Sequence, residues 1–301
     1  MRTDYDKIVN VNSIGGTNTI KMNDVLAMAG EEKLRPSNQD KKRNLLIAID
    51  MQNDFMENGA LGVANSHGDV ERLTKFIYNN MEDITRIACT IDTHSVHQIF
   101  HPCWWVDQNG NHPAPYTQIT LADLDAGKWL PVIMPAKSRE YVQKLEAAGK
   151  KKLMVWTYHC LQGTSGCALE GQLTNVVNFH AVARKAALNM LTKGQNPVSE
   201  MYGFLREEDT SKPIINPQFL DELETFDKVI IAGEAADYCV YESLLQLLQY
   251  YTIKNTKILN KIYVLKDCMS GINDADTVKK MYDELQSKYK FNIVESTENF
   301  L

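Results

Sequence analysis

One cysteine stands where a short apolar run gives way to a helical pattern. The run KVII is followed by AGEAADYCVYESLL, residues 232–245, and Cys239 falls at the turn between the expected strand and the expected helix. A helix N-terminus offers unpaired N–H groups and the positive end of the macrodipole, and both stabilise a thiolate. We therefore expect Cys239 to ionise easily and to act as a nucleophile. The alternative is a small buried hydrophobe, the usual role of a free cysteine.

Two charged residues at other expected strand ends can assist that thiol. Asp50 ends the run LLIAID, and Lys193 ends the run NMLTK. A cysteine amidase needs a group that moves protons and donors for the oxyanion. Asp50 can accept the thiol proton, Lys193 can hold that carboxylate and stabilise the thiolate, and the N–H groups of Ala235 and Cys239 lie beside the sulfur. Taken singly, Asp50 also suits a helix cap and Lys193 the protein surface.

A second cluster has the residue types of a metal site. Asp92 and His94 lie two apart in TIDTH, and His159 follows a strand-like run in WTYHC. Carboxylate and imidazole are typical ligands of zinc, manganese or iron, and three such ligands leave positions open for water or substrate. The alternative is a polar loop with exposed histidines. For His97 and His101 we expect a place lining the cavity or capping a turn.

The elements that position these residues alternate along the chain. Apolar runs predict strands that end at Asp50, Asp92, Gly233 and Asp267, with weaker candidates at LMVW and at NMLTK. Helical patterns cover roughly 69–80, 171–182, 242–251 and 275–289. This alternation is typical of a mostly parallel sheet, and ligands of such sheets bind at the carboxyl ends of the strands. The candidate residues are therefore expected on one rim.

Two segments lie outside this alternation. Residues 1–43 are polar without a clear period, and GEEKLRPSNQDKKR within them predicts an exposed connection. Residues 103–150 form a long excursion, and all four tryptophans (104, 105, 129 and 156) lie in it or at its exit. Long connections are usually functional covers or disordered, and disordered segments are poor in aromatics. We therefore expect an ordered lid over the rim that influences the choice of substrate.

Composition excludes several partner classes. The chain has 301 residues and a formal net charge of −6 with no basic stripe, so a nucleic-acid partner is not expected. No apolar run approaches the roughly 18 residues of a membrane span, and the N-terminus does not resemble a signal peptide. The six cysteines lack CxxC spacing and are expected as free thiols in a reducing cytoplasm.

Five of these blocks, in order, resemble a known family. LLIAIDMQNDF, DTH, WTYHCLQGTSG, KGQNPVSEMYGF and GEAADYCV are similar to motifs of the cysteine hydrolases with the isochorismatase-like fold, and the nicotinamidase/pyrazinamidase branch is the most similar. The resemblance spans roughly 44–294. It implies a three-layer α/β/α domain over 44–301 with a mostly parallel central sheet, an N-terminal extension at 1–43 and a lid-like insertion at about 103–150.

The resemblance also implies roles for individual residues. It makes Asp50, Lys193 and Cys239 the catalytic triad, and it places a non-proline cis peptide between Glu234 and Ala235 that aims the Ala235 N–H into the oxyanion hole. Its implied ligands for one divalent metal, zinc in preference to manganese or iron, are Asp92, His94 and His159. The residues that it places around the substrate ring are Phe55, Trp156, Tyr202 and Tyr238.

The function implied is cleavage of a small nicotinamide-like amide to acid and ammonia, with metal assistance and through a thioester on Cys239. Carbamoyl-cleaving relatives generally lack the metal set, which favours the nicotinamidase-like branch. The chain departs from that branch in DTHSVHQIFHPCWW, in MYGF and in its insertion. Two alternatives therefore remain: the same triad acting on another small amide or carbamoyl substrate selected by the insertion, and a non-catalytic ligand-binding relative. Homo-oligomerisation is left open.

Overall fold

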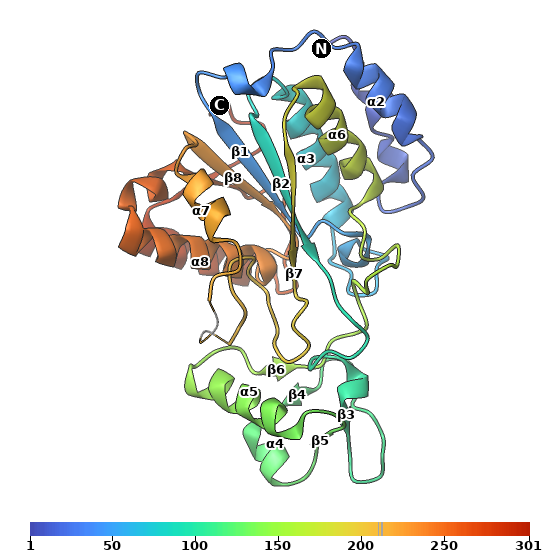
Figure 1. Ribbon diagram of the computed structural model, residues 1–301, viewed down its shortest axis with the longest axis vertical. Helices are drawn as coiled ribbons and strands as arrows, with labels where there is room; N and C mark the ends of the chain where they lie inside the picture. The colour runs from blue at the N-terminus through green and yellow to red at the C-terminus, as the bar shows by residue number, and fades with distance from the viewer. Residues whose placement is uncertain (210, 212) are drawn as a thin grey trace.

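A parallel sheet forms the centre of the molecule. The computed structural model describes residues 1–209, 211 and 213–301. Within them, six strands pair in the order β10-β9-β8-β1-β2-β7, and every neighbouring pair is parallel (Figure 1). These strands are β1 Asn44–Ile49, β2 Arg86–Asp92, β7 Leu188–Lys193, β8 Lys228–Gly233, β9 Ile262–Leu265 and β10 Asn292–Val294.

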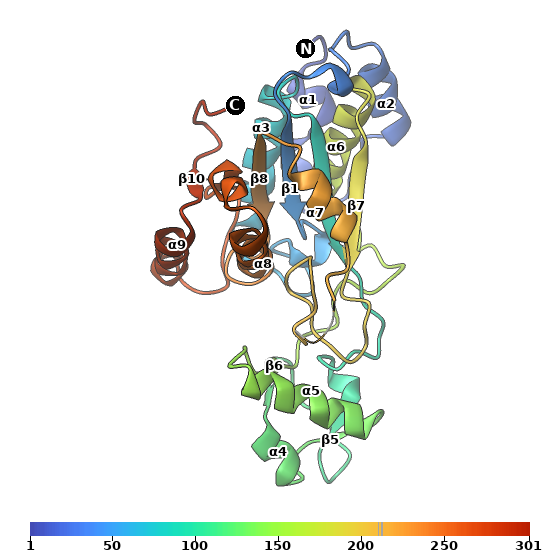
Figure 2. The same ribbon diagram turned by 60° about the vertical axis from the view of Figure 1, so that its left-hand side comes forward.

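Helices cover both faces of this sheet, as its apolar strands require. Successive side chains of a strand point to opposite faces. Accordingly, Leu46 and Ala48 pack in one core with α1, α2, α3 and α6, whereas Leu45 and Ile47 pack in a second core with α7, α8 and α9 (Figures 1 and 2). The predicted three-layer α/β/α arrangement is therefore confirmed. The helices of these layers are α1 Tyr5–Ile8, α2 Met22–Gly30, α3 Ser66–Asn79, α6 Gly171–Ala183, α7 Pro217–Leu223, α8 Cys239–Lys254 and α9 Ala275–Tyr289.

The N-terminal residues are more ordered than the sequence indicated. Helix α2 lies against α6, and its residues Val25 and Ala29 are buried in the first core together with Ile8 and Val9. The polar residues around α2 hid this packing, although α2 itself (MNDVLAMAG) is mostly apolar. In the described part of the chain, no helix combines the length and apolarity needed to cross a membrane.

The insertion folds as a lobe beyond the carboxyl edge of the sheet (Figures 1 and 2). It has its own apolar core, in which Trp104 and Trp105 are fully buried. The expectation that LMVW adds a strand to the central sheet is wrong, because Leu153–Met154 pairs within this lobe. The lobe contains α4 Leu121–Asp125, α5 Pro135–Ala147 and two antiparallel strand pairs, β3 Trp105–Val106 with β5 Leu130–Pro131 and β4 Gln118–Ile119 with β6 Leu153–Met154.

Candidate active site

Three strand ends bring Asp50, Lys193 and Cys239 together. Asp50 directly follows β1, Lys193 is the last residue of β7, and Cys239 is the first residue of α8. The Lys193 ammonium lies 2.9 Å from an Asp50 carboxylate oxygen and 3.8 Å from the Cys239 sulfur. All three side chains are buried. The residues chosen from strand ends thus share one site, although they are far apart in the sequence.

Lys193 is the central charge of this site. Its ammonium also lies 3.2 Å from the Asp92 carboxylate and donates a hydrogen bond to the Met201 carbonyl at 2.9 Å. Burial lowers the pKa of Lys193, but the carboxylates of Asp50 and Asp92 outweigh burial and raise this pKa well above its ordinary value. Lys193 is therefore a permanent cation between two buried anions.

The Cys239 thiol does not ionise easily in this arrangement. Burial raises the pKa of Cys239 well above its ordinary value, and the nearby Lys193 cation opposes that rise without cancelling it. A hydrogen bond with Asp50 acts in the same direction as burial. The expectation from the helix N-terminus is therefore wrong for this site, because desolvation outweighs the helix end. A neutral thiol needs a base within reach, and Asp50 is in that position.

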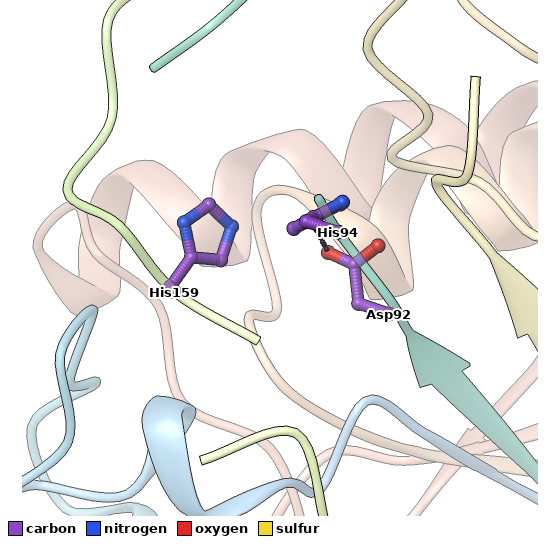
Figure 3. A group of neighbouring side chains, drawn as sticks. All are labelled: Asp92, His94 and His159. Atoms are coloured by element: carbon purple, nitrogen blue, oxygen red, sulfur yellow. Dashed lines mark ion pairs between the residues drawn. The ribbon is translucent and has the colours of Figure 1, made fainter. Parts of the chain in front are cut away.

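Asp92, His94 and His159 form the expected second cluster (Figure 3). Their candidate ligand atoms all lie within 4.8 Å of one another, and the three residues are buried. His94 Nδ1 is hydrogen-bonded to the Gly194 carbonyl at 2.9 Å, and His159 Nδ1 to the Thr157 carbonyl at 2.8 Å. A carbonyl can only accept, so both rings carry a proton on Nδ1, and Nε2 is the candidate ligand atom of each; His94 Nε2 lies 3.0 Å from an Asp92 carboxylate oxygen. The donor set fits a divalent metal.

A glycine makes room for this cluster. Gly194 directly follows Lys193 and has a φ of +75°, a conformation that residues with a side chain rarely adopt. A Cβ at this position would lie 2.4 Å from an Asp92 carboxylate oxygen and 2.5 Å from the His94 ring. The dipeptide Lys193-Gly194 therefore contributes to both clusters. Lys193 pairs with Asp50 in the triad, and Gly194 leaves the space that Asp92 and His94 occupy.

Removing one ligand of the cluster tests its assignment. We expect His159→Ala to lower the affinity for a divalent metal by about tenfold or more, because an imidazole ligand is lost. Elemental analysis after equilibration with a limiting metal concentration measures this loss. His112→Ala is the matched control, since His112 Nδ1 contacts the Trp105 carbonyl inside the inserted lobe at 2.7 Å. Equal metal content in both variants would contradict the assignment.

A cavity beside the triad is lined mostly by apolar and aromatic side chains. It encloses about 510 Å³ of empty space including its mouth, and Asp92, His94, His159 and Cys239 lie in its wall. The rings of Trp156, Tyr202 and Tyr238 meet edge to face, with centroids 5.5–6.5 Å apart. The four residues that the resemblance placed around the substrate ring all line this cavity: Phe55, Trp156, Tyr202 and Tyr238.

The lobe does not place its tryptophans over the cavity. Trp104 and Trp105 are buried in the core of the lobe, and Trp104 Nε1 donates to the Ser138 hydroxyl at 2.9 Å. Among the described residues that line the cavity, Trp156 is the single tryptophan. The insertion is ordered, as expected, and the rings of Trp104 and Trp105 supply the core that the lobe needs to fold.

Several residues outside the predicted set also support the site. Gln52 accepts a hydrogen bond from the Asp92 N–H at 2.7 Å and donates one to the Asp92 carbonyl at 2.8 Å, so it holds that strand end in place. The Thr90 hydroxyl donates to Asp50. Thr90 lies in β2 and Gln52 lies two residues after Asp50, and neither polar side chain carries a local signal of its long-range partner. The peptide bond between Glu234 and Ala235 is cis, as the resemblance implied.

The additional histidines differ in their environment. His97 is exposed. His101 is buried, its Nδ1 is hydrogen-bonded to the Val96 carbonyl at 3.0 Å, and its ring lies 5.7 Å from that of His159. Burial lowers the pKa of His101 to about 4, so that its imidazole is neutral around pH 7. Neither histidine is among the described residues that line the cavity, and His101 is the N-cap residue of the short helix Pro102–Trp104.

Comparison with known proteins agrees with this architecture. No protein-family model matches the chain. The nicotinamidase of Escherichia coli K12 is 25% identical over 230 residues, which cover 76% of this chain and 83% of that protein. An Acinetobacter baumanii nicotinamidase/pyrazinamidase structure has a TM-score of 0.59 at 21% identity and covers 86% of this chain and 98% of its own. The yeast nicotinamidase bound to the inhibitor nicotinaldehyde also reaches 0.59 at 21% identity, covering 84% of this chain and 99% of its own.

Proposed function

We propose that this chain cleaves a small aromatic amide through a thioester on Cys239. The proposal proceeds from its similarity to nicotinamidases, which are amidohydrolases of the isochorismatase-like fold. The observation that carries the proposal is the position of Lys193, 2.9 Å from Asp50 and 3.8 Å from the Cys239 sulfur, at a cavity lined by aromatic rings. A cysteine amidase needs a thiol, a base and a fixed cation close together, and Cys239, Asp50 and Lys193 provide these groups.

The reaction proceeds in two halves. Asp50 takes the Cys239 proton as the sulfur attacks the amide carbonyl, and Lys193 compensates the negative charge that passes between them. The N–H groups of Ala235 and Cys239, which both line the cavity, receive the oxyanion. As the C–N bond breaks, Asp50 returns the proton to the departing ammonia. A water molecule, activated by the same carboxylate, then hydrolyses the thioester to the acid and restores the thiol.

The protonation states of the resting site suit this sequence of steps. Because burial raises the pKa of Cys239, the thiol keeps its proton until a substrate fills the cavity. Burial also raises the pKa of Asp50, while Lys193 lowers it. The net effect raises the pKa of Asp50, and a higher pKa makes the carboxylate a better base for a thiol.

Asp92, His94 and His159 are the proposed ligands of one divalent metal, for which zinc suits the donor set best. When bound, the metal would supply a Lewis-acid contact that orients the substrate through a ring nitrogen or a bridging water. Phe55, Trp156, Tyr202 and Tyr238 hold the ring from the other walls of the cavity.

Ammonia release from nicotinamide tests the proposal. We expect the purified, metal-replete protein to release ammonia from nicotinamide and from pyrazinamide, with nicotinic acid as the second product of the former. A coupled glutamate dehydrogenase assay and chromatography of the acid measure both products. A folded, metal-bound protein that released ammonia from neither amide would refute an aromatic amide as the substrate.

A further inference from the structure

A buried carboxylate connects the inserted lobe with the cavity. Glu200 is 2% exposed and lines the cavity. One of its carboxylate oxygens accepts a hydrogen bond from the Tyr202 hydroxyl at 2.6 Å, and the other accepts one from the Tyr141 hydroxyl at 3.1 Å. Tyr141 belongs to α5 of the lobe, and its hydroxyl also accepts from the Glu200 N–H at 2.9 Å. Glu200 therefore has the lobe on one side and the cavity wall on the other.

The connection extends to the aromatic wall. Trp156 Nε1 donates to the Tyr202 hydroxyl at 3.2 Å, so that this hydroxyl accepts from Trp156 while it donates to Glu200. The polar ends of both rings are occupied by protein groups, and the rings themselves remain for the substrate. Flat ring faces in a confined cavity favour flat aromatic ligands by stacking and edge-to-face contact.

Two ion pairs between the lobe and the main body are of a different kind, and Lys151 adds a further contact by donating to the Asp237 carbonyl at 2.9 Å. Lys144 pairs with Asp209 at 3.1 Å, and Lys150 pairs with Glu208 at 2.8 Å. Both lysines are partly exposed, whereas Asp209 and Glu208 are buried, so solvent screens these pairs in part. The Tyr141–Glu200 contact is buried, so breaking it leaves a polar group without its partner.

We propose that Glu200 is a positioning residue that fastens the inserted lobe to Tyr202 and Trp156, and that it thereby sets the affinity of the cavity for flat aromatic amides. The inference rests on the amidase function proposed above. Under this proposal the inserted lobe has a role at the active site: through Tyr141 and Glu200 it holds Tyr202 and Trp156 in position. Glu200 takes no part in the chemistry at Cys239.

The ionisation of Glu200 gives this coupling a pH dependence. Burial raises the pKa of Glu200 to about 7, and the nearby Glu208 carboxylate adds to the rise, while the hydroxyls of Tyr202 and Tyr141 oppose it. The ionised carboxylate accepts from both tyrosines, whereas the protonated acid has one oxygen occupied by its own proton. The wall is therefore braced more firmly above pH 7 than below it, and KM is expected to fall as pH rises through neutrality.

Glu200→Gln is the first test, because an amide of the same shape can accept from only one of the two tyrosines. We expect KM for nicotinamide to rise about tenfold while kcat stays within about twofold of the wild-type value. The rise in KM corresponds to the binding free energy of about one buried hydrogen bond. The change of KM between pH 6 and pH 8 should be smaller in this variant. A kcat that falls as much as kcat/KM, or an unchanged KM, would overturn the proposal.

Tyr141→Phe is the second variant, and it removes the bond to the lobe without changing the cavity lining. We expect it to raise KM in the same direction as Glu200→Gln, because α5 no longer holds the carboxylate. Tyr251→Phe is the matched control: Tyr251 is a fully buried tyrosine whose hydroxyl donates to the Leu220 carbonyl, outside the cavity, and its loss should leave KM unchanged. Equal KM values in Tyr141→Phe and Tyr251→Phe would contradict the coupling.

Hydrogen exchange separates this inference from the proposed function. In Glu200→Gln we expect the amides of α5, Pro135–Ala147, to exchange about tenfold faster than in the unchanged chain, whatever the substrate is. Faster exchange with no ammonia release from aromatic amides would leave the coupling intact and refute the substrate class. Ammonia release with unchanged exchange and unchanged KM would leave the function intact and overturn the role of Glu200.

Discussion

Replacing Cys239 with alanine lowers the rate of ammonia release by about 10⁴-fold or more, because no other group on this wall can form the thioester. The thiol lies 3.8 Å from the Lys193 ammonium, which pairs with Asp50 at 2.9 Å, and both charged residues serve the chemistry of the sulfur. The substitution leaves Asp92, His94 and His159 unchanged, so metal content should stay at the level of the unchanged chain. Ammonia release and metal content measure these two effects, and the thermal midpoint checks that the variant is folded.

Another buried cysteine supplies the control for this experiment. Cys89 is fully buried in β2 and packs in the first core, so Cys89→Ala removes a thiol of similar burial outside the cavity lining. It should keep most of its activity and lose some stability, as small core truncations do. Substantial turnover by Cys239→Ala, with Cys89→Ala as the reference, would exclude a covalent mechanism through this residue.

Lys193→Met should both abolish activity and destabilise the fold. The fully buried ammonium compensates the carboxylates of Asp50 and Asp92, and methionine has a similar volume without the charge. Two carboxylates then remain in the interior without their cation, a situation that costs about 3–5 kcal/mol when a buried pair is broken. Urea denaturation of the metal-free protein measures the loss of free energy of unfolding, and ammonia release measures the loss of activity.

A second substitution distinguishes the charge effect from a packing effect. Adding Asp50→Asn to Lys193→Met removes one of the uncompensated carboxylates, so part of the stability should return while activity stays absent. Lys279→Met is the control on the surface, where the exposed pair with Asp283 contributes little and the urea midpoint should not move. A Lys193→Met variant as stable as Lys279→Met would show that the buried cation does not hold the site together.

Local sequence patterns were sufficient to predict which residues lie at the carboxyl edge of the sheet. Continuous apolar runs bounded by polar residues predicted where β1, β2, β7 and β8 end, and Asp50, Asp92, Lys193 and Cys239 therefore fell on one edge. This inference is reliable for a parallel sheet because all carboxyl ends lie on the same side, whatever the order of the strands. The order itself, and the edge strand β10, depended on contacts that the runs do not encode.

Burial was the quantity that the sequence could not supply. A cysteine at a helix N-terminus predicts an easily ionised thiol, yet the Cys239 side chain is almost completely enclosed and its pKa rises instead. Likewise, the tryptophans of the insertion suggested a cover over the cavity, and Trp104 and Trp105 turned out to form the core of the lobe. In both cases the residue was correctly identified as important, but its burial in the tertiary structure determines its role.

The sequence by itself determined which residues can do chemistry here and which side of the sheet they occupy, because residue type and strand period are local properties. Only the tertiary structure decided which of them touch. The Tyr141–Glu200 contact joins residues 59 apart, and the Lys193–Cys239 contact joins residues 46 apart. Contacts of this range are fixed by how the layers pack, so the second carboxylate partner of Lys193, Asp92, and the Tyr141–Glu200 contact had no signature along the chain.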